Sequence, residues 1–141
     1  MDAYLTMSSL QYINEKGAGQ KHSDQCHYSQ CVILGDIVKC SGQGGWDNEG
    51  NLDGEDWKGQ IDNAFDNVDR VLQAAGLRGW KDVYSIRSYQ LDIAMHYDYF
   101  VEKLKKRIPG HRPIWTAWSV PKLAFPPMTV EIEVEAYRGK Q

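Results

Sequence analysis

Long hydrophobic runs are missing from the chain, and cysteine is scarce. No stretch of its 141 residues approaches the roughly 20 apolar residues that span a bilayer. The first residues, MDAYLTMSSL, include an acid and lack the basic and then apolar layout of a signal peptide. Cysteine occurs three times, and this odd number suits a reducing compartment. We therefore expect no membrane partner and a cytoplasmic location, with an organelle as the alternative.

An excess of basic residues is also missing. The net charge is -3 at pH 7, which gives the chain no general attraction for nucleic acid. The one basic cluster, at residues 103–107, is short, and its charges suit the end of a helix. The length suits one domain over residues 1–141, in which we expect residues 1–24 to be a polar segment that wraps the surface.

The common cofactor and nucleophile motifs are missing as well. His22, Cys26, His27 and Cys31 lie close together, but their spacing matches no common zinc pattern. Ser41 lies in SGQGG, which lacks the glycine two residues before the serine of a nucleophile elbow. The following GQGGWDNEG has neither Walker nor dinucleotide-binding spacing. We therefore expect no metal and no cofactor.

What the sequence does contain begins with a predicted β-hairpin at residues 27–43. Two runs rich in β-branched residues flank a two-residue turn, Gly35-Asp36. Counting outward from this turn pairs Cys31 with Cys40, either as an oxidisable pair or as two small buried side chains. Strand alternation then predicts four polar side chains on one face at the open end. They are Tyr28, Gln30, Ser41 and Gln43, and they form either a functional site or a solvent-exposed strand end.

Two amphipathic helices and three further strands follow the hairpin. The first helix begins after Asp56, a candidate N-cap, and ends near Gly76. The remaining elements are a strand at 81–92, a helix at 97–108, and strands at 114–120 and 128–138.

This order, β-β-α-β-α-β-β, predicts an α+β fold with two layers. If both helices are right-handed crossover connections between strands, both lie on one face of a mixed sheet. The other face, which we expect to carry Trp115 or Trp118, Tyr89 or Ile86 and one face of the hairpin, is apolar and has no cover within the chain. Self-association is the simplest cover for such a face.

Arg112, in the segment HRPIWTAW, lies at the root of a predicted strand. Arginine seldom occupies such a place without an anion to bind, and beside Pro113 its planar guanidinium suits a carboxylate. Glu131 would orient a water molecule for attack if its face lined a subunit cleft. The residues alone leave open two simpler interpretations: a structural salt bridge for Arg112 and an exposed face for the glutamates.

Taken together, these segments resemble the Rid/YjgF family of reactive intermediate deaminases, also labelled L-PSP endoribonuclease-like. The resemblance extends from about Tyr28 to Tyr137. Its motifs, in order, are YSQCVILGDIVKCSGQGG, AFDNVDRVLQAAGL, DVYSIRSYQLD, HRP and VEIEVEA.

The resemblance implies a chorismate-mutase-like fold and a homotrimer with clefts between its subunits. In the deaminase branch a cleft arginine binds the carboxylate of a 2-imino or 2-enamino acid, which is hydrolysed to a 2-oxo acid and ammonia without a cofactor. By position, Arg112 matches that arginine and Glu131 matches the glutamate that holds the attacking water. Tyr28 and Ser41 match substrate-binding residues of the family.

Some features depart from the family pattern. Ile114 stands where the deaminase branch commonly has a small residue or cysteine, and the connection at 120–127 is longer by several residues. Trp46, Trp115 and Trp118 add aromatic bulk near the expected cleft. The alternatives are therefore a carboxylate-binding or chaperone-like trimer without turnover, and an enzyme for a bulkier imine or carbonyl compound. The acidic net charge disfavours RNA cleavage.

Overall fold

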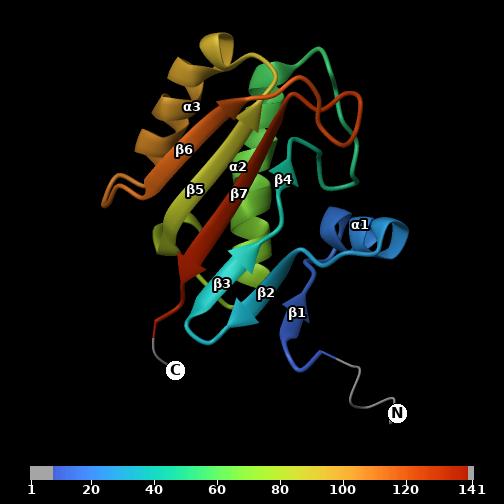
Figure 1. Cartoon of the computed structure of the whole chain (residues 1–141), viewed down its shortest axis with the longest axis vertical. Coiled ribbons are helices and arrows are strands. Elements are labelled where there is room, and N and C mark those ends of the chain that lie inside the picture. Colours follow the sequence, from blue (N-terminus) through green and yellow to red (C-terminus); the bar gives the residue numbers. More distant parts are fainter. Residues whose placement is uncertain (1–7, 140–141) are drawn as a thin grey trace.

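A mixed seven-stranded sheet forms the centre of the molecule in the computed structural model, which describes residues 8–139. The strands are β1 (Gln11–Ile13), β2 (Cys31–Leu34), β3 (Ile37–Cys40), β4 (Gln43–Gly44), β5 (Val83–Gln90), β6 (Ile114–Ser119) and β7 (Val130–Tyr137). The helices are α1 (Ala18–Cys26), α2 (Trp57–Ala74) and α3 (Ile93–Arg107). The strand order is β1-β2-β3-β7-β5-β6, and β4 pairs with β7 (Figure 1). Within the described residues no helix is long and apolar enough to cross a membrane.

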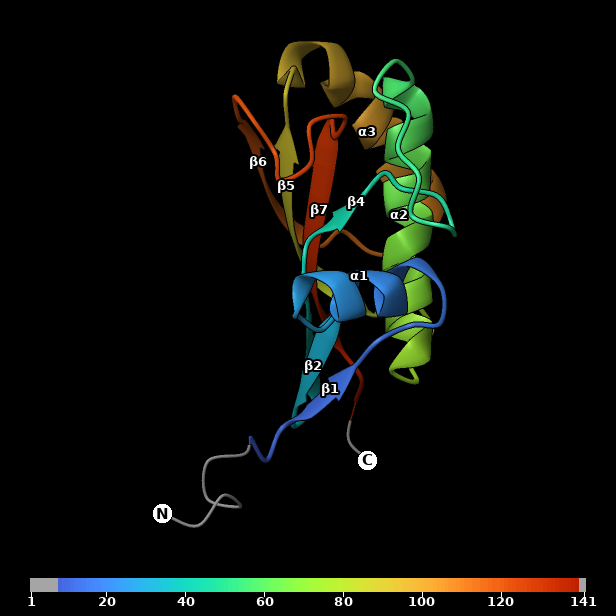
Figure 2. The same ribbon diagram turned by 90° about the vertical axis from the view of Figure 1, so that its right-hand side faces the viewer.

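Helices α2 and α3 lie on the same face of the sheet (Figure 2). The side chain of Asp56 caps α2 by accepting a hydrogen bond from the backbone N–H of Gly59 at 2.9 Å. Phe65 of α2 is fully buried between the rings of Trp80 and Phe100, with centroids 4.6 Å and 5.1 Å away. Strand β5 precedes α3 in the chain and β6 follows it, and these two strands are parallel, as a crossover helix requires. The two-layer α+β fold with both helices on one face is confirmed.

The hairpin register is confirmed for the pairs between Cys31 and Cys40. Leu34 pairs with Ile37 across the turn, and Cys31 pairs with Cys40. Both of these cysteines are buried free thiols. In β7 the residues Val130, Ile132, Val134 and Ala136 are buried against the helices, so the intervening glutamates lie on the open face of the sheet.

The open end of the hairpin differs from the prediction because the register shifts by one residue. Lys39 lies opposite Glu135 in β7, but Gln43 lies opposite Ile132 rather than Glu131. Gln43 therefore shares the helix-facing side with Ile132, and its Nε2 donates to Oε1 of the equally buried Gln30 at 2.9 Å. The expectation that all four polar side chains share one face is therefore wrong for Gln43, and Gln30 is buried with it.

The polar segment before the hairpin forms more structure than its pattern predicts. Strand β1 pairs with β2, placing Tyr12 opposite Val32. Helix α1 follows at the side of the molecule next to β2 (Figures 1 and 2). Its residue Ala18 is buried in a small cluster with Trp46 and Met128, so contacts distant in sequence fix this polar helix.

Candidate functional site

Glu131 lies on the open face of the sheet, where β7 passes between β4 and β5. Its neighbours across these strands are Gly44 and Tyr89. The carboxylate lies directly over Gly42, because a Cβ atom added there would be 1.9 Å from the Oε1 atom of Glu131. The Glu131 carboxylate can therefore occupy this position only because Gly42 has no side chain.

The three glutamates of β7 differ in their partners. The hydroxyl of Tyr89 donates to Glu133 at 2.9 Å, and the hydroxyl of Tyr84 donates to Glu135 at 3.1 Å. Glu131 has no hydrogen bond or ion pair with any residue of the described chain, 8–139. Burial raises the pKa of Glu131, and the negative charge of Glu133 acts in the same direction. Glu131 is thus a partly buried acceptor with its hydrogen-bonding capacity unused, as a water-orienting base requires.

Tyr28 and Ser41 line a hollow of about 710 Å³ along the hairpin together with Glu133, and Tyr28 also lies within range of the charge of Glu131. The Ser41 hydroxyl donates to the backbone carbonyl of Ser29 at 2.7 Å, which leaves its oxygen lone pairs to accept from a ligand. Burial raises the pKa of Tyr28, and the charge of Glu131 adds to this effect. The Tyr28 phenol therefore stays protonated near neutral pH.

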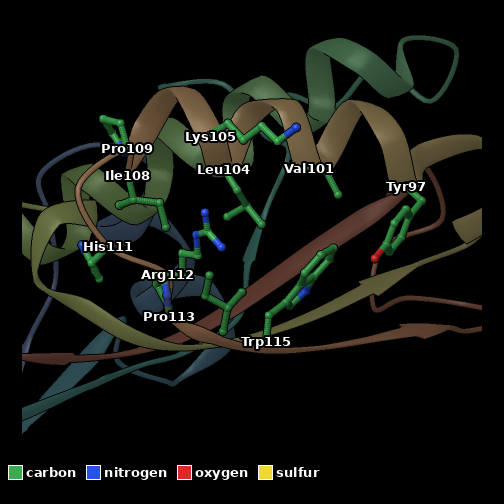
Figure 3. Close-up of a pocket in the computed structure, with 11 residues that line it drawn as sticks. Tyr97, Val101, Leu104, Lys105, Ile108, Pro109, His111, Arg112, Pro113 and Trp115 are labelled. Carbon is green, nitrogen blue, oxygen red and sulfur yellow. The ribbon is translucent and has the colours of Figure 1, made fainter.

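Arg112 lies just before β6, on the helix side of the sheet. Figure 3 shows its guanidinium pointing into a hollow between α3 and β6, which measures about 660 Å³. We call this hollow the α3–β6 pocket. Its apolar lining consists of Ile86, Tyr97, Val101, Leu104, Ile108 and Trp115.

The guanidinium of Arg112 has no hydrogen bond or ion pair within residues 8–139, unlike the other arginines of the chain. Arg107, for comparison, binds the carboxylates of both Asp66 and Asp69 across the two helices. The structural salt bridge considered for Arg112 thus has no partner among the described residues. Arg112 is exposed, so its guanidinium at the mouth of this apolar pocket is open to an anionic ligand from solvent.

Arg112 and Glu131 do not meet within one subunit. Glu131 is aligned with Tyr89, and Tyr89 with Trp118 of β6. Arg112 precedes Trp118 by six residues of extended chain, which places it about 20 Å away along the strands. One copy of the chain therefore brings Tyr28, Ser41 and Glu131 together but leaves Arg112 at the far end of the sheet.

The three tryptophans expected near a cleft occupy different places. Trp115 lines the α3–β6 pocket, Trp118 stacks on Tyr89 on the open face with centroids 5.3 Å apart, and Trp46 is buried. Tyr97 belongs to the pocket too, although its pattern indicates only an ordinary helix stripe. No group of three or more metal-ligating side chains is found within residues 8–139.

The mixed sheet with both long helices on one face defines a class of proteins with a two-layer α+β architecture. The family model described as Endoribonuclease L-PSP matches residues 20–138. The chain belongs to this family, which also carries the names YjgF and Rid. A comparison with curated protein sequences found no significant match.

Several solved structures are similar over almost the whole chain. Protein YjgH is 26% identical, with a TM-score of 0.82 over 95% of this chain and 100% of its own. Rv2704 from Mycobacterium tuberculosis, a member of the YjgF/YER057c/UK114 family, is 26% identical, with a TM-score of 0.74 over 92% of this chain and 99% of its own. RidA from the Antarctic bacterium Psychrobacter sp. PAMC 21119 is 27% identical, with a TM-score of 0.73 over 93% and 99%.

Proposed function

We propose that the protein hydrolyses 2-imino and 2-enamino acids to 2-oxo acids and ammonia in clefts between its subunits. The observation that carries this proposal is the complementary pair of groups left without partners, Arg112 on one side of the sheet and Glu131 on the other. The guanidinium offers a carboxylate two parallel hydrogen bonds, and the glutamate offers a water molecule an acceptor.

The chemistry needs no group beyond these side chains and water. The carboxylate of the substrate binds Arg112, which fixes the electrophilic imine carbon in the cleft. Glu131 accepts a proton from water as the water oxygen bonds to the imine carbon, and it passes this proton to the nitrogen. Glu131 then accepts the proton of the new hydroxyl group and passes it to the nitrogen as well. The C–N bond then breaks, ammonia leaves, and a carbonyl group remains. The lone pairs of Ser41 accept from the substrate N–H, and the protonated Tyr28 donates to the substrate.

The separation within one subunit supports a site shared between copies. Because about 20 Å of strand divides Arg112 from Glu131, both can reach one small substrate only if they come from different chains. The open sheet face carries Ile114 and Trp118, exposed to 73% and 42%, and a partner subunit would cover them. We propose the closed ring of three subunits that the family resemblance implies.

Mixing two inactive variants tests the shared site directly. Arg112→Ala and Glu131→Gln chains, each inactive alone, are co-expressed with different tags, and the mixed oligomers are assayed for ammonia released from enzymatically generated 2-aminoacrylate. In a random mixture about one quarter of the clefts combine an intact Arg112 with an intact Glu131, so about one quarter of wild-type activity is expected. The two variants purified separately and combined without subunit exchange form the control. If wild type releases ammonia but the mixed oligomers do not, the shared cleft is refuted.

A second candidate is a carboxylate-binding oligomer without turnover. The exposed Ile114 favours it, because this position departs from the deaminase pattern. It predicts that pyruvate raises the melting temperature of wild type but not of Arg112→Ala, while ammonia release with wild type equals the rate without protein. RNA cleavage is disfavoured, since the net charge is -3 and the open face carries three glutamates of β7.

A further inference from the structure

The α3–β6 pocket is apolar along its length and charged at one end. Figure 3 shows the Arg112 guanidinium directed into the hollow, with Val101 and Leu104 of α3 on one side and Trp115 of β6 on the other. The volume of about 660 Å³ lies within the range of roughly 300–1,000 Å³ of small-molecule sites. A three-carbon acid on Arg112 would leave most of this apolar lining in contact with water.

Trp115 gives the pocket a rigid aromatic wall. Its ring stacks with the rings of Tyr97 and of Phe100, with centroids 5.4 Å and 5.2 Å away and planes within 17° and 13° of parallel. Its Nε1 donates to the hydroxyl of Ser88 at 2.9 Å, so the one polar atom of the ring already has a partner. The wall therefore offers apolar contacts, and a ligand need not supply a hydrogen bond to it.

The charges at the pocket select for one carboxylate. Lys105 also lines the pocket, but its ammonium pairs with Glu102 at 3.2 Å. Arg112 is thus the pocket cation without an acidic partner among residues 8–139. A monocarboxylate fits this arrangement better than a dicarboxylate.

We propose that the substrate is a 2-imino monocarboxylate with a large apolar, preferably aromatic, side chain that lies in the α3–β6 pocket while its carboxylate binds Arg112. This inference rests on the proposed function for the reaction, but the recognition of the side chain is a separate property of the pocket. Each methylene group buried on binding contributes a factor of about four in affinity. A phenyl group that fills the pocket should therefore raise affinity over a methyl group by at least about tenfold.

Calorimetry on the full chain with two 2-oxo acids tests the pocket. We expect 3-phenyl-2-oxopropanoate to bind wild type at least about tenfold more tightly than pyruvate. Val101→Trp, which fills the pocket, should bring this ratio close to one. Tyr97→Ala, at a position 46% exposed and therefore tolerant of truncation, removes the outer aromatic wall and should lower the ratio as well. Lys106→Trp places the same indole on the exposed side of α3 as a matched control and should keep the wild-type ratio.

Parallel rates of ammonia release from the imines of phenylalanine and alanine, generated by an amino acid oxidase, separate this inference from the proposed function. Binding of the phenyl compound that depends on Tyr97, without any acceleration of hydrolysis, would support the pocket and overturn the deaminase. Accelerated hydrolysis with equal preference for both imines, unchanged in Val101→Trp and Tyr97→Ala, would overturn the pocket and leave the deaminase standing.

Discussion

Replacing Gly42 by alanine should abolish most activity while leaving the fold intact. The new Cβ would lie 1.9 Å from the Oε1 atom of Glu131 and 2.6 Å from its carboxyl carbon. Ordinary contact begins at 3.4 Å, so the carboxylate must move by about 1.5 Å. A displacement of about 1 Å at a reacting group can cost about 100-fold in rate, and we expect kcat for imine hydrolysis to fall by about that factor.

The stability of the protein should hardly change. Gly42 does not have a positive φ, so alanine fits the backbone there. The displaced group is the end of a flexible side chain, and moving it to another rotamer costs about 1 kcal/mol. The reduced freedom of the unfolded chain offsets this by about 0.4–1 kcal/mol. The melting temperature should therefore stay within about 4 °C of wild type.

Ammonia release and thermal melting are measured on the same samples, with Gly54→Ala as the matched control. A Cβ at Gly54 would meet its nearest neighbour, Pro127, at an ordinary 3.5 Å. Gly54→Ala should therefore match wild type in both assays. Full activity in Gly42→Ala would refute the assignment of Glu131 to the water, and a large loss of stability would refute the claim that only its side chain moves.

Three further predictions concern charge, a hydrogen bond and the core. Glu133→Gln should shift the acid limb of the kcat/KM profile to lower pH, because the Glu133 charge helps raise the pKa of Glu131, which must be ionised to accept a proton. Tyr99→Phe should lower the free energy of unfolding in urea by about 1 kcal/mol, since the Tyr99 hydroxyl donates to Asp62 at 2.7 Å. Phe65→Ala, at a position with 0% exposure, should lower it by about 3–5 kcal/mol.

Each of these has its own check. Glu135 lies further along β7 from Glu131 than Glu133 does, so Glu135→Gln should move the acid limb of the kcat/KM profile less than Glu133→Gln does. The bond to Asp62 raises the pKa of Tyr99 to about 12, so it stabilises fully below pH 10 and is lost as the pH rises toward 12. The difference between wild type and Tyr99→Phe should shrink over that range, and a constant difference would contradict the bond. A loss below 1 kcal/mol in Phe65→Ala would contradict its place at the centre of the core.

Local chemistry predicted much of the fold. The Gly35-Asp36 turn alone sets the pairing of the hairpin, and Asp56 marks the start of α2 because a side-chain cap is a local contact. The alternation in β7 correctly separates Val134 and its neighbours from the glutamates.

What could not be predicted depends on contacts between distant segments. Helix α1 has no apolar stripe, and Ala18 is held by Trp46 and Met128 from other parts of the chain. Gln43 turns inward because β7 imposes a register shift that the hairpin sequence does not carry. The α3–β6 pocket escaped prediction because an apolar residue such as Val101 has the same pattern whether it faces a core or a ligand.

The site residues could likewise be predicted from the sequence only in part. Arg112 stands out in sequence because an arginine at the root of a strand is unusual, and Glu131 because it begins an alternating acidic face. The special status of Glu131 among three equivalent glutamates becomes visible only when the partners of Glu133 and Glu135 are known. Sequence pattern gives candidates, and the hydrogen bonds of their neighbours distinguish between them.

Gln60 of α2 fixes one end of the connection between β6 and β7, so the length of this connection can change. Its Nε2 donates to the carbonyl of Pro127 at 2.8 Å, and its Oε1 accepts from the N–H of Thr129 at 2.9 Å, two residues before Glu131. At the other end of this connection the N–H of Val120 donates to the carbonyl of Gln90 at 2.8 Å. Residues added or removed between these two anchors need not disturb β7. Designed insertions can therefore be placed in this loop without changing the register that positions Glu131.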